Sequence, residues 1–496
     1  MKKRKMRKGV KILLIVLGSI VGLCLLVAIA GLLFLAFWPS VGKMPGKEER
    51  ETYAKKSELY YDKKFHNEID FTVMTGKQDA TSDRKVPEEQ LKAADPTYAE
   101  RGQEGGLVIT WIGHSSTLLQ LGTSNILIDP VLGNRSSPVS FAGPKRFSEC
   151  PVTVESLPEI DVLFISHDHY DHLEYATIKD IDAKVKRYIV PLGVEVILKG
   201  WGVSEDKITA LNWWEEVTMD NVMYALTPSL HYTGRNPLKA NSTLWGGLFM
   251  NDGSHKVYYT GDGGYYDVFS RVYEKYGEAD LMLGDSGQYD TAWATTHMFP
   301  EQTVQAAIDA HAKWLIPVHW GTFSLSNHAW DDPIIRVAAA AEAKGVNLAT
   351  PRYGQTVDYA EIATSTEHWW EAGSETMEGK SLKLKIGDTE VTVDWTNNES
   401  IRALKALVAD KPLIVSMSMY GGFEQVGSLG STLPRDDKKT TTEAGDIVLY
   451  SGNRIVVFYG SNSWEYTRLG KITDKTASEM KDLLGNGDIT LTLYTE

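Results

Sequence analysis

The sequence predicts a layered α/β domain that follows a single transmembrane helix and precedes a small, mostly β domain. Three observations lead to this prediction. An uncharged run near the N-terminus is long enough to span a bilayer. Short apolar runs then alternate with helical patterns over residues 106–363, as in α/β domains. A change of composition near Thr364 separates this region from a segment with strand-like alternation.

The N-terminal segment is predicted to be an uncleaved membrane anchor. Residues 12–38 contain 27 positions without a charged side chain, and a helix needs about 20 to cross the hydrocarbon core. Six of the first nine residues are basic, and such residues beside a span resist translocation. We therefore expect residues 1–11 to be a cytoplasmic tail in a single-pass cell-membrane protein, with the catalytic domain extracytoplasmic. A cleaved signal peptide is the alternative, but it would end at small residues, whereas this run ends in Phe37 and Trp38.

Charge and cysteine content exclude two classes of protein. The formal net charge is −14, and it would be −20 without the six basic residues among the first nine. So acidic a body argues against nucleic acid as a partner, because polyanions bind basic surfaces. The two cysteines are Cys24, inside the apolar run, and Cys150, which we expect to be a packing residue. An intrachain disulfide framework is thereby excluded.

Residues 39–105 are polar and of mixed charge, with little apolar periodicity. They are predicted to be a stalk and an approach segment before the α/β domain of residues 106–363. Within that domain the patterns predict the following strands and helices. The strands are 107–112, 125–129, 161–166, 187–190, 222–226 and 256–260, and the helices are 300–312 and 333–344.

A linker and a second domain are predicted after residue 363. Residues 364–379 are rich in Ser, Thr and Glu, which is typical of a linker. Residues 380–496 form a mostly β module that is large enough to fold alone, with a helix that Asn397 or Asn398 could cap and that ends near Val408. Its expected strands are 382–386, 390–394, 413–417, 446–450 and 454–459.

A dense group of metal-binding residue types follows the predicted strand 161–166. Three histidines and two aspartates fall within six residues, in a chain with only 12 histidines, so a chance polar loop is improbable. Imidazole and carboxylate groups suit borderline metals such as zinc. The residues are His167, Asp168, His169, Asp171 and His172.

Three further candidates lie at the ends of other predicted strands. His231 follows Leu230, Asp262 lies between glycines in a tight turn, and His319 ends the apolar run 314–318. Taken singly, each is more often a satisfied polar residue than a ligand. Together they supply the groups that a site for two metals still lacks.

With these residues the chain resembles the metallo-β-lactamase superfamily, and more narrowly its N-acyl-phosphatidylethanolamine-hydrolysing phospholipase D branch. The resemblance covers about residues 60–360 and implies an αββα sandwich. Two segments, 231–235 and 283–289, depart from the phospholipase pattern. The segments that carry the narrower match are 111–116, 128–130, 143–147, 157–161, 190–193, 213–215, 244–246 and 319–323.

The resemblance implies a role for each candidate. One metal would be held by His167, His169 and His231. The other would be held by Asp171, His172 and His319, with Asp262 bridging the two. Asp171 and Asp262 would also hold the reactive water, and His297 would lie near the substrate phosphate and serve in catalysis. His114 is expected to order a loop, and Asp168 is expected to face away from the metals.

Two divalent metal ions, zinc or alternatively manganese or iron, can activate water for attack on phosphorus or on a carbonyl carbon. The first hypothesis is a phosphodiesterase acting on a membrane phospholipid, of the phospholipase D type. The second is a lactonase or another esterase that takes a small soluble molecule. The third is a non-enzymatic envelope binding protein with a vestigial fold, against which the complete ligand set argues. The natural substrate and the oligomeric state are not predicted.

The C-terminal module is similar to the bacterial cyclophilin-like domain. The segments that carry this similarity are 445–450, 457–464 and 466–470. It implies a small closed barrel, and a role in binding or in substrate gating is expected rather than prolyl isomerase activity.

Overall fold

The computed structural model describes residues 8–371, 381–396, 398–408 and 411–495. The chain divides into two compact units, Met1–Glu367 and His368–Glu496. Their boundary falls inside the predicted linker 364–379, of which residues 372–379 lie outside the described residues. In the described part of that linker the side chains of Trp369 and Trp370 are buried, so residues 364–371 are partly packed.

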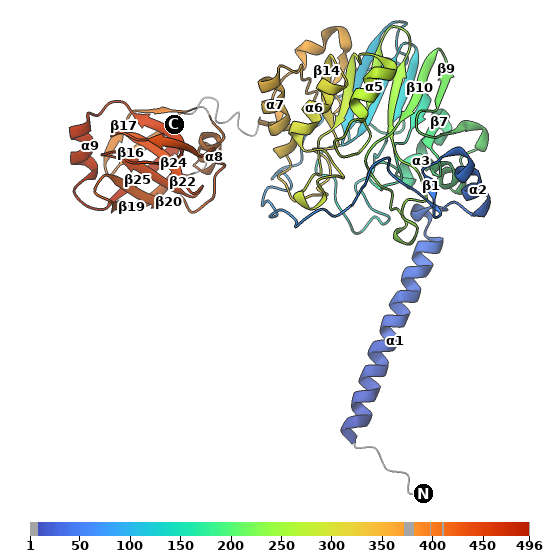
Figure 1. Cartoon of the computed structure of the whole chain (residues 1–496), viewed down its shortest axis with the longest axis horizontal. Coiled ribbons are helices and arrows are strands. Elements are labelled where there is room, and N and C mark those ends of the chain that lie inside the picture. The colour runs from blue at the N-terminus through green and yellow to red at the C-terminus, as the bar shows by residue number, and fades with distance from the viewer. Residues whose placement is uncertain (1–7, 372–380, 397, 409–410, 496) are drawn as a thin grey trace. The chain divides into compact units, whose positions relative to one another are not determined.

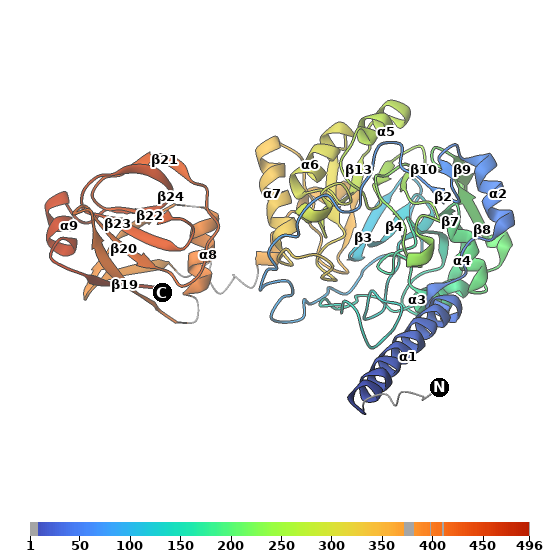
Figure 2. The same ribbon diagram turned by 60° about the horizontal axis from the view of Figure 1, so that its bottom comes forward.

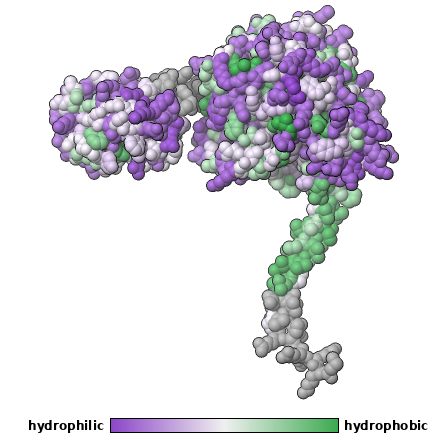
Figure 3. All heavy atoms as spheres, viewed as in Figure 1, coloured by the Kyte–Doolittle hydropathy of each residue, from purple (hydrophilic) through white to green (hydrophobic). Residues whose placement is uncertain are grey.

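The N-terminal apolar run forms one long helix, α1 (Lys8–Phe37), which projects from the rest of the N-terminal unit (Figure 1). Its segment Val16–Phe37 has 22 residues and a mean hydropathy of 2.9, and none of it is buried within the protein. By length and composition this segment can cross a membrane, although a signal sequence would have the same properties. Figure 3 shows it as a continuous apolar surface.

Two β-sheets form the centre of the N-terminal unit (Figure 2). The first has the strand order β15-β3-β4-β5-β6-β7-β8, and the second has the order β14-β13-β12-β11-β10-β9. The first sheet comprises β3 (Leu107–Gly113), β4 (Ser116–Leu121), β5 (Ser124–Ile128), β6 (Ile160–Phe164), β7 (Val185–Pro191), β8 (Ile208–Leu211) and β15 (Thr356–Asp358). The second comprises β9 (Glu216–Met219), β10 (Val222–Thr227), β11 (Gly247–Asn251), β12 (Lys256–Tyr259), β13 (Leu281–Asp285) and β14 (Trp314–Val318).

Helices cover the outer face of each sheet. Helices α3 (Tyr175–Ile181) and α4 (Val194–Gly200) share one apolar core with the first sheet. Helices α5 (Val268–Tyr276), α6 (Pro300–Asp309) and α7 (Asp332–Lys344) share another core with the second sheet. Each helix buries one apolar stripe, as Val268, Phe269 and Val272 do in α5. The layer order helix–sheet–sheet–helix confirms the predicted αββα sandwich.

The segment 39–105 is not a stalk, and that prediction is wrong. It contains a 3₁₀ turn (Pro39–Val41), α2 (Lys47–Lys56), β1 (Tyr60–Tyr61) and β2 (Lys64–Phe65), and it belongs to the N-terminal unit. Several of its apolar side chains, such as Tyr60 and Phe65, are buried, and the hydroxyl of Tyr53 donates to Glu195 in α4. Their irregular spacing follows the surface of the domain rather than one helix or strand, which is why no periodicity marked them.

The C-terminal unit is a single coiled sheet with two helices. The strand order is β17-β16-β25-β19-β20-β23-β22-β24-β18, and β21 pairs with β24. Strands β17 and β18, at the two ends of this order, are joined by Thr392 alone, so the sheet curls back on itself around one core. The strand predicted at 390–394 is therefore two strands. Asn398 caps α8 by accepting from Ile401 N at 3.0 Å, and Asn397 lies outside the described residues.

The elements of this unit match the predicted mostly β composition. They are β16 (Leu382–Ile386), β17 (Thr389–Val391), β18 (Val393–Trp395), α8 (Glu399–Leu407), β19 (Leu413–Tyr420), β20 (Glu424–Ser428), β21 (Lys438–Thr441), β22 (Asp446–Tyr450), β23 (Arg454–Phe458), β24 (Ser463–Ile472), α9 (Ala477–Leu484) and β25 (Ile489–Thr495).

Candidate metal centre

The candidate residues come from loops at one edge of the two sheets. Strands β5 and β6 are parallel in the first sheet, and β12, β13 and β14 are parallel in the second. The carboxyl ends of parallel strands lie at the same edge of a sheet, and the loops that leave them meet there. The loop 165–174 follows β6, Asp262 follows β12, and His319 follows β14. The loops that leave the two sheets therefore bring their candidate residues to one place.

Three imidazoles form the first group. His167 Nε2 lies 2.9 Å from His169 Nδ1, and His231 Nε2 lies 3.4 Å from the same nitrogen. Burial is the largest effect on all three, and it lowers the pKa of His167, His169 and His231. Neutral imidazoles keep a free lone pair, so this group can bind a cation.

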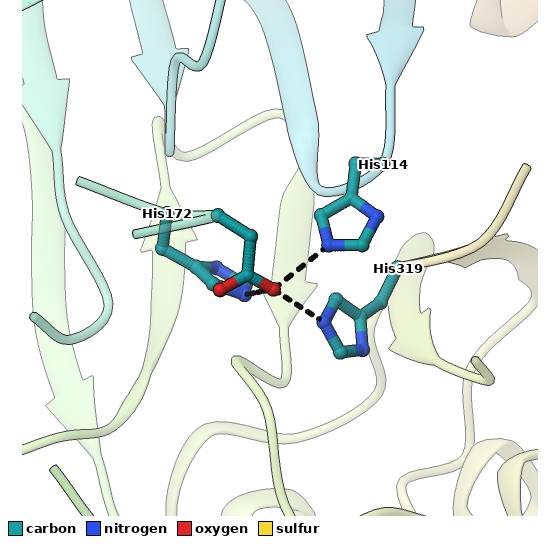
Figure 4. A group of neighbouring side chains, drawn as sticks. His114, His172 and His319 are labelled. Carbon is teal, nitrogen blue, oxygen red and sulfur yellow. Dashed lines mark hydrogen bonds and ion pairs between the residues drawn. The ribbon is translucent and has the colours of Figure 1, made fainter. Parts of the chain in front are cut away.

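A second group gathers around the carboxylate of Asp171. Figure 4 shows His114, His172 and His319 turned towards it. The Asp171 Oδ2 atom lies 3.0 Å from His114 Nε2, 3.4 Å from His172 Nε2 and 3.2 Å from His319 Nε2. His114 was expected only to order a loop, and the structure adds this contact. Burial and the charge of His319 lower the pKa of His114 to about 4, so a neutral His114 donates its Nε2–H to Asp171.

Asp262 lies between the two groups. Its Oδ2 atom is 3.1 Å from Nε2 of His172, 3.1 Å from Nε2 of His319 and 3.8 Å from Nε2 of His167. The turn that carries it needs Gly261, which has φ +62° and leaves 2.6 Å between a built Cβ and the carbonyl of Gly246. The carboxylate therefore lies between the two groups, where it could bridge two cations.

The surrounding protein fixes which nitrogen of each histidine faces the centre. His319 donates Nδ1–H to Asp285 at 3.0 Å, and His172 donates Nδ1–H to Asp129 at 2.7 Å. His231 donates Nδ1–H to the carbonyl of Thr296 at 3.1 Å. Each of these partners can only accept, so the Nε2 lone pair is left for a metal, as in most metal-binding histidines.

His167 is held in the same way through Ser166. The Ser166 hydroxyl donates to Asp129 Oδ2 at 2.5 Å and therefore accepts from His167 Nδ1 at 2.9 Å. Asp129 and Asp285, two of these supporting partners, were not among the predicted site residues. Asp129 lies in the quoted segment 128–130 and Asp285 in the segment 283–289, so both were visible as motif residues without an assigned role.

Two observations show that the donor set fits divalent cations. Among the described residues, His172 Nε2 and Asp262 Oδ1 are buried without a hydrogen-bond partner, although buried polar atoms are rarely left so. In addition, burial lowers the pKa of His319, but Asp262 and Asp285 outweigh that effect and raise it to about 10. The carboxylates thus attract positive charge, which a metal ion supplies in place of protons. The His and Asp composition suits zinc, manganese or iron.

His297 is partly buried, as is His169, whereas the other predicted site residues are buried. His297 precedes α6, and its Nδ1 lies 3.2 Å from Asp285 Oδ2, so Asp285 joins His297 to the metal-facing His319. Asp168 points away from the centre as predicted. Its carboxylate accepts from the hydroxyl of Thr243 at 2.9 Å and from the backbone N–H of Arg235 at 3.3 Å.

The backbone is strained at three residues of the centre. His114, Asp129 and His319 have φ values of +53°, +41° and +67°. Residues other than glycine rarely adopt such values, and they persist only where the surroundings enforce them. All eight predicted site residues are thus brought into one preorganised cluster.

Comparison with known proteins gives the family. Residues 124–320 match the beta-lactamase superfamily domain, and residues 384–494 match the cyclophilin-like family. An uncharacterized protein of Mycobacterium tuberculosis is 40% identical over 262 residues, which are 52% of this chain and 70% of that protein. N-acyl-phosphatidylethanolamine-hydrolyzing phospholipase D 1 of Caenorhabditis elegans is 33% identical over 264 residues, 51% of this chain and 74% of that protein.

Among solved structures, the metallo hydrolase Igni18 of Ignicoccus hospitalis is 20% identical, with a TM-score of 0.41, and the match covers 51% of this chain and 98% of that one. The sequence relatives, together with the sandwich and its His and Asp cluster, determine the assignment. The chain is a metal-dependent hydrolase of the metallo-β-lactamase superfamily, and it carries a C-terminal cyclophilin-like domain.

Proposed function

We propose that this hydrolase is a binuclear phosphodiesterase, anchored in the cell membrane by α1, that acts on a phospholipid-like substrate. One observation carries the proposal: seven ligand-type side chains from both sheets gather in one cluster, with His297 beside them. The seven are His167, His169, Asp171, His172, His231, Asp262 and His319.

The residues of the centre divide the work. Two bound cations, of which zinc is the first choice, would activate water and stabilise negative charge on the phosphate. Asp262 links the two ligand groups, and Asp171 lies at the centre of the second. Asp129 and Asp285 orient the imidazoles of His172 and His319. His297 keeps its Nδ1–H on Asp285 and, when protonated on both nitrogens, presents its Nε2–H to a phosphate or leaving-group oxygen.

The substrate class rests on the relatives and on α1. The Caenorhabditis elegans relative bears the name of a phospholipase D that hydrolyses N-acyl-phosphatidylethanolamine. A membrane anchor keeps a hydrolase close to such lipids, and α1 is long and apolar enough to be one. A lactonase or esterase remains the alternative that the experiment must separate.

The test compares substrates and metals on the full chain in lipid nanodiscs. Activity is assayed after metal removal and again after addition of zinc. The substrates are bis-p-nitrophenyl phosphate, an N-acyl-phosphatidylethanolamine and a panel of lactones. We expect zinc-dependent release from both phosphodiesters. Turnover of lactones without turnover of either phosphodiester would overturn the proposal, and loss of all activity with metal bound would favour a binding protein.

The proposed topology has its own test. The six basic residues before Gly9 support an N-terminus in the cytoplasm and a hydrolase domain outside. External protease added to intact cells should then release an active fragment. A hydrolase domain that becomes cleavable only after lysis would reverse the orientation.

A further inference from the structure

Two large apolar side chains are exposed on loops of the hydrolase domain that contact the end of α1. Phe141 is 79% exposed and Leu238 is 66% exposed. Phe141 lies at the tip of a loop that is closed at its base, where Ser136 N donates to Pro144 O at 3.2 Å and Arg146 N donates to Asn134 O at 2.9 Å. These two side chains are called the apolar rim below.

Hydrogen bonds fix both loops to the last turn of α1 and to the residues directly after it. The indole N–H of Trp38 donates to Pro138 O at 2.8 Å, and the hydroxyl of Ser40 donates to the same carbonyl at 2.6 Å. On the other loop, the amide of Asn236 donates to Leu35 O at 3.4 Å. The rim is therefore tied to the helix and is not free to move away from it.

The position of these hydrogen bonds relative to the bilayer decides what the apolar rim contacts. The uncharged run 12–37 has 26 residues, and at 1.5 Å per residue of helix it measures about 39 Å, which exceeds the roughly 30 Å of hydrocarbon but stays within the roughly 40–45 Å of a bilayer with its headgroups. Leu35 lies inside this segment and Trp38 directly after it. Loops bonded to these residues must lie at the level of the lipid headgroups, where exposed aromatic and apolar side chains are favoured.

The same loops lead directly to the metal centre. Arg235, next to Asn236, donates Nε–H to Ser40 O at 2.8 Å and Nη1–H to Asp168 O at 2.9 Å, inside the ligand loop. Leu238 is seven residues from the ligand His231. Exposed Lys145 and Lys239 lie close in sequence to the two rim residues, and their ammonium groups are suited to anionic headgroups.

From this geometry we infer that the hydrolase domain docks directly on the lipid bilayer through the apolar rim, so that the metal centre takes its substrate from the membrane surface. The inference rests on the proposed anchor α1. The other occupants of such a rim would be a protein partner or a second copy of the chain. The hydrogen bonds between the loops and the span require a bilayer beside the rim, but they require neither of these partners.

The test measures the environment of single labels in the full chain. Nitroxide labels are placed by Phe141→Cys and Leu238→Cys in a background of Cys24→Ser and Cys150→Ser, in nanodiscs of phosphatidylcholine and phosphatidylglycerol. The control for an aqueous site is Ile308→Cys on α6, where the native residue is 39% exposed. The control for a lipid site is native Cys24 labelled in the Cys150→Ser chain.

We expect labels at 141 and 238 to be relaxed by oxygen and shielded from a water-soluble nickel chelate, as the label at Cys24 is. Chelate access at 141 and 238 equal to that at 308 would overturn the docking, and so would shielding of both labels from oxygen as well as from the chelate, which indicates a protein partner. A Cys24 label open to the chelate would refute the anchor and the docking together.

A functional measurement separates docking from the proposed activity. Phe141→Ser with Leu238→Ser should leave hydrolysis of bis-p-nitrophenyl phosphate within about twofold of normal and lower hydrolysis of phospholipid in the bilayer about tenfold, because two apolar side chains no longer enter the lipid. Equal loss on both substrates would count against docking. If the normal chain hydrolyses no phospholipid while both labels are shielded, the docking stands and the proposed substrate fails.

Discussion

Replacing Asp285 by Asn should impair the metal centre without touching a metal ligand. Asp285 accepts from His319 Nδ1 at 3.0 Å, from His297 Nδ1 at 3.2 Å and from Gly263 N at 3.1 Å. Asn keeps the shape of the side chain but has one acceptor oxygen instead of two, and its amino group can only donate. One of the two histidines must therefore lose its partner.

The size of the effect follows from that lost bond. A hydrogen bond to a charged group contributes about 1.5–3 kcal/mol, and each 1.4 kcal/mol is tenfold. Metal affinity or kcat/KM should therefore fall about 10- to 100-fold, the usual range for the partners of metal-binding histidines. If the lost bond is that of His319, metal affinity falls, and if it is that of His297, kcat falls with metal content near normal.

The measurement is competition for zinc against a chelator of known affinity, together with kinetics on bis-p-nitrophenyl phosphate. Asp280→Asn is the matched control, because Asp280 precedes the same strand at its opposite end and pairs with Lys313 at 2.8 Å. We expect this variant to bind zinc and turn over substrate normally. An Asp285→Asn protein that behaves like Asp280→Asn in both assays would refute the positioning role.

The remaining predictions concern the metals and the C-terminal domain. The full chain should hold about two transition-metal ions by elemental analysis, and a chelator should lower its Tm because bound ions stabilise the folded state. Asp262→Ala should lose more metal than His297→Ala, which should lower kcat at near-normal metal content, and equal metal loss would make His297 a ligand. A fragment of residues 380–496 should melt cooperatively, since its core is self-contained. Burial raises the pKa of Glu424 from 4.5 to about 7, so the folded domain retains a proton that the unfolded chain releases. The Tm of the fragment should fall as the pH rises from 4.5 to about 7, and Glu424→Gln should flatten that profile.

Much of the fold was predictable because its signals are local. A strand buried on both faces, such as Ile160–Phe164, is a continuous apolar run, and α7 shows the 3.6-residue spacing of an apolar stripe. The split between Val391 and Val393 was not predictable, because a sharp bend inside one alternating run is set by how the sheet closes.

The site shows a similar division. The ligand residues could be predicted because His and Asp cluster in sequence or stand at strand ends. Asp129 and Asp285 could not be given roles, since a buried carboxylate beside a histidine is a matter of three-dimensional contact. Once β5, β6, β13 and β14 are aligned, both carboxylates fall behind the histidines that they orient.

The segment 39–105 also changes what counts as the catalytic unit. The amide of Asn67 donates to His231 O at 2.8 Å, and His231 N donates to Asn67 Oδ1 at 3.2 Å, so the backbone of a proposed metal ligand is held by this segment. Ser40 accepts from Arg235, which in turn holds the ligand loop through Asp168 O. The proposed span, the wrapping segment and the metal centre are therefore connected by a short series of hydrogen bonds. Because Ser40 follows the span by only three residues, the centre cannot be held far from the membrane that the span crosses.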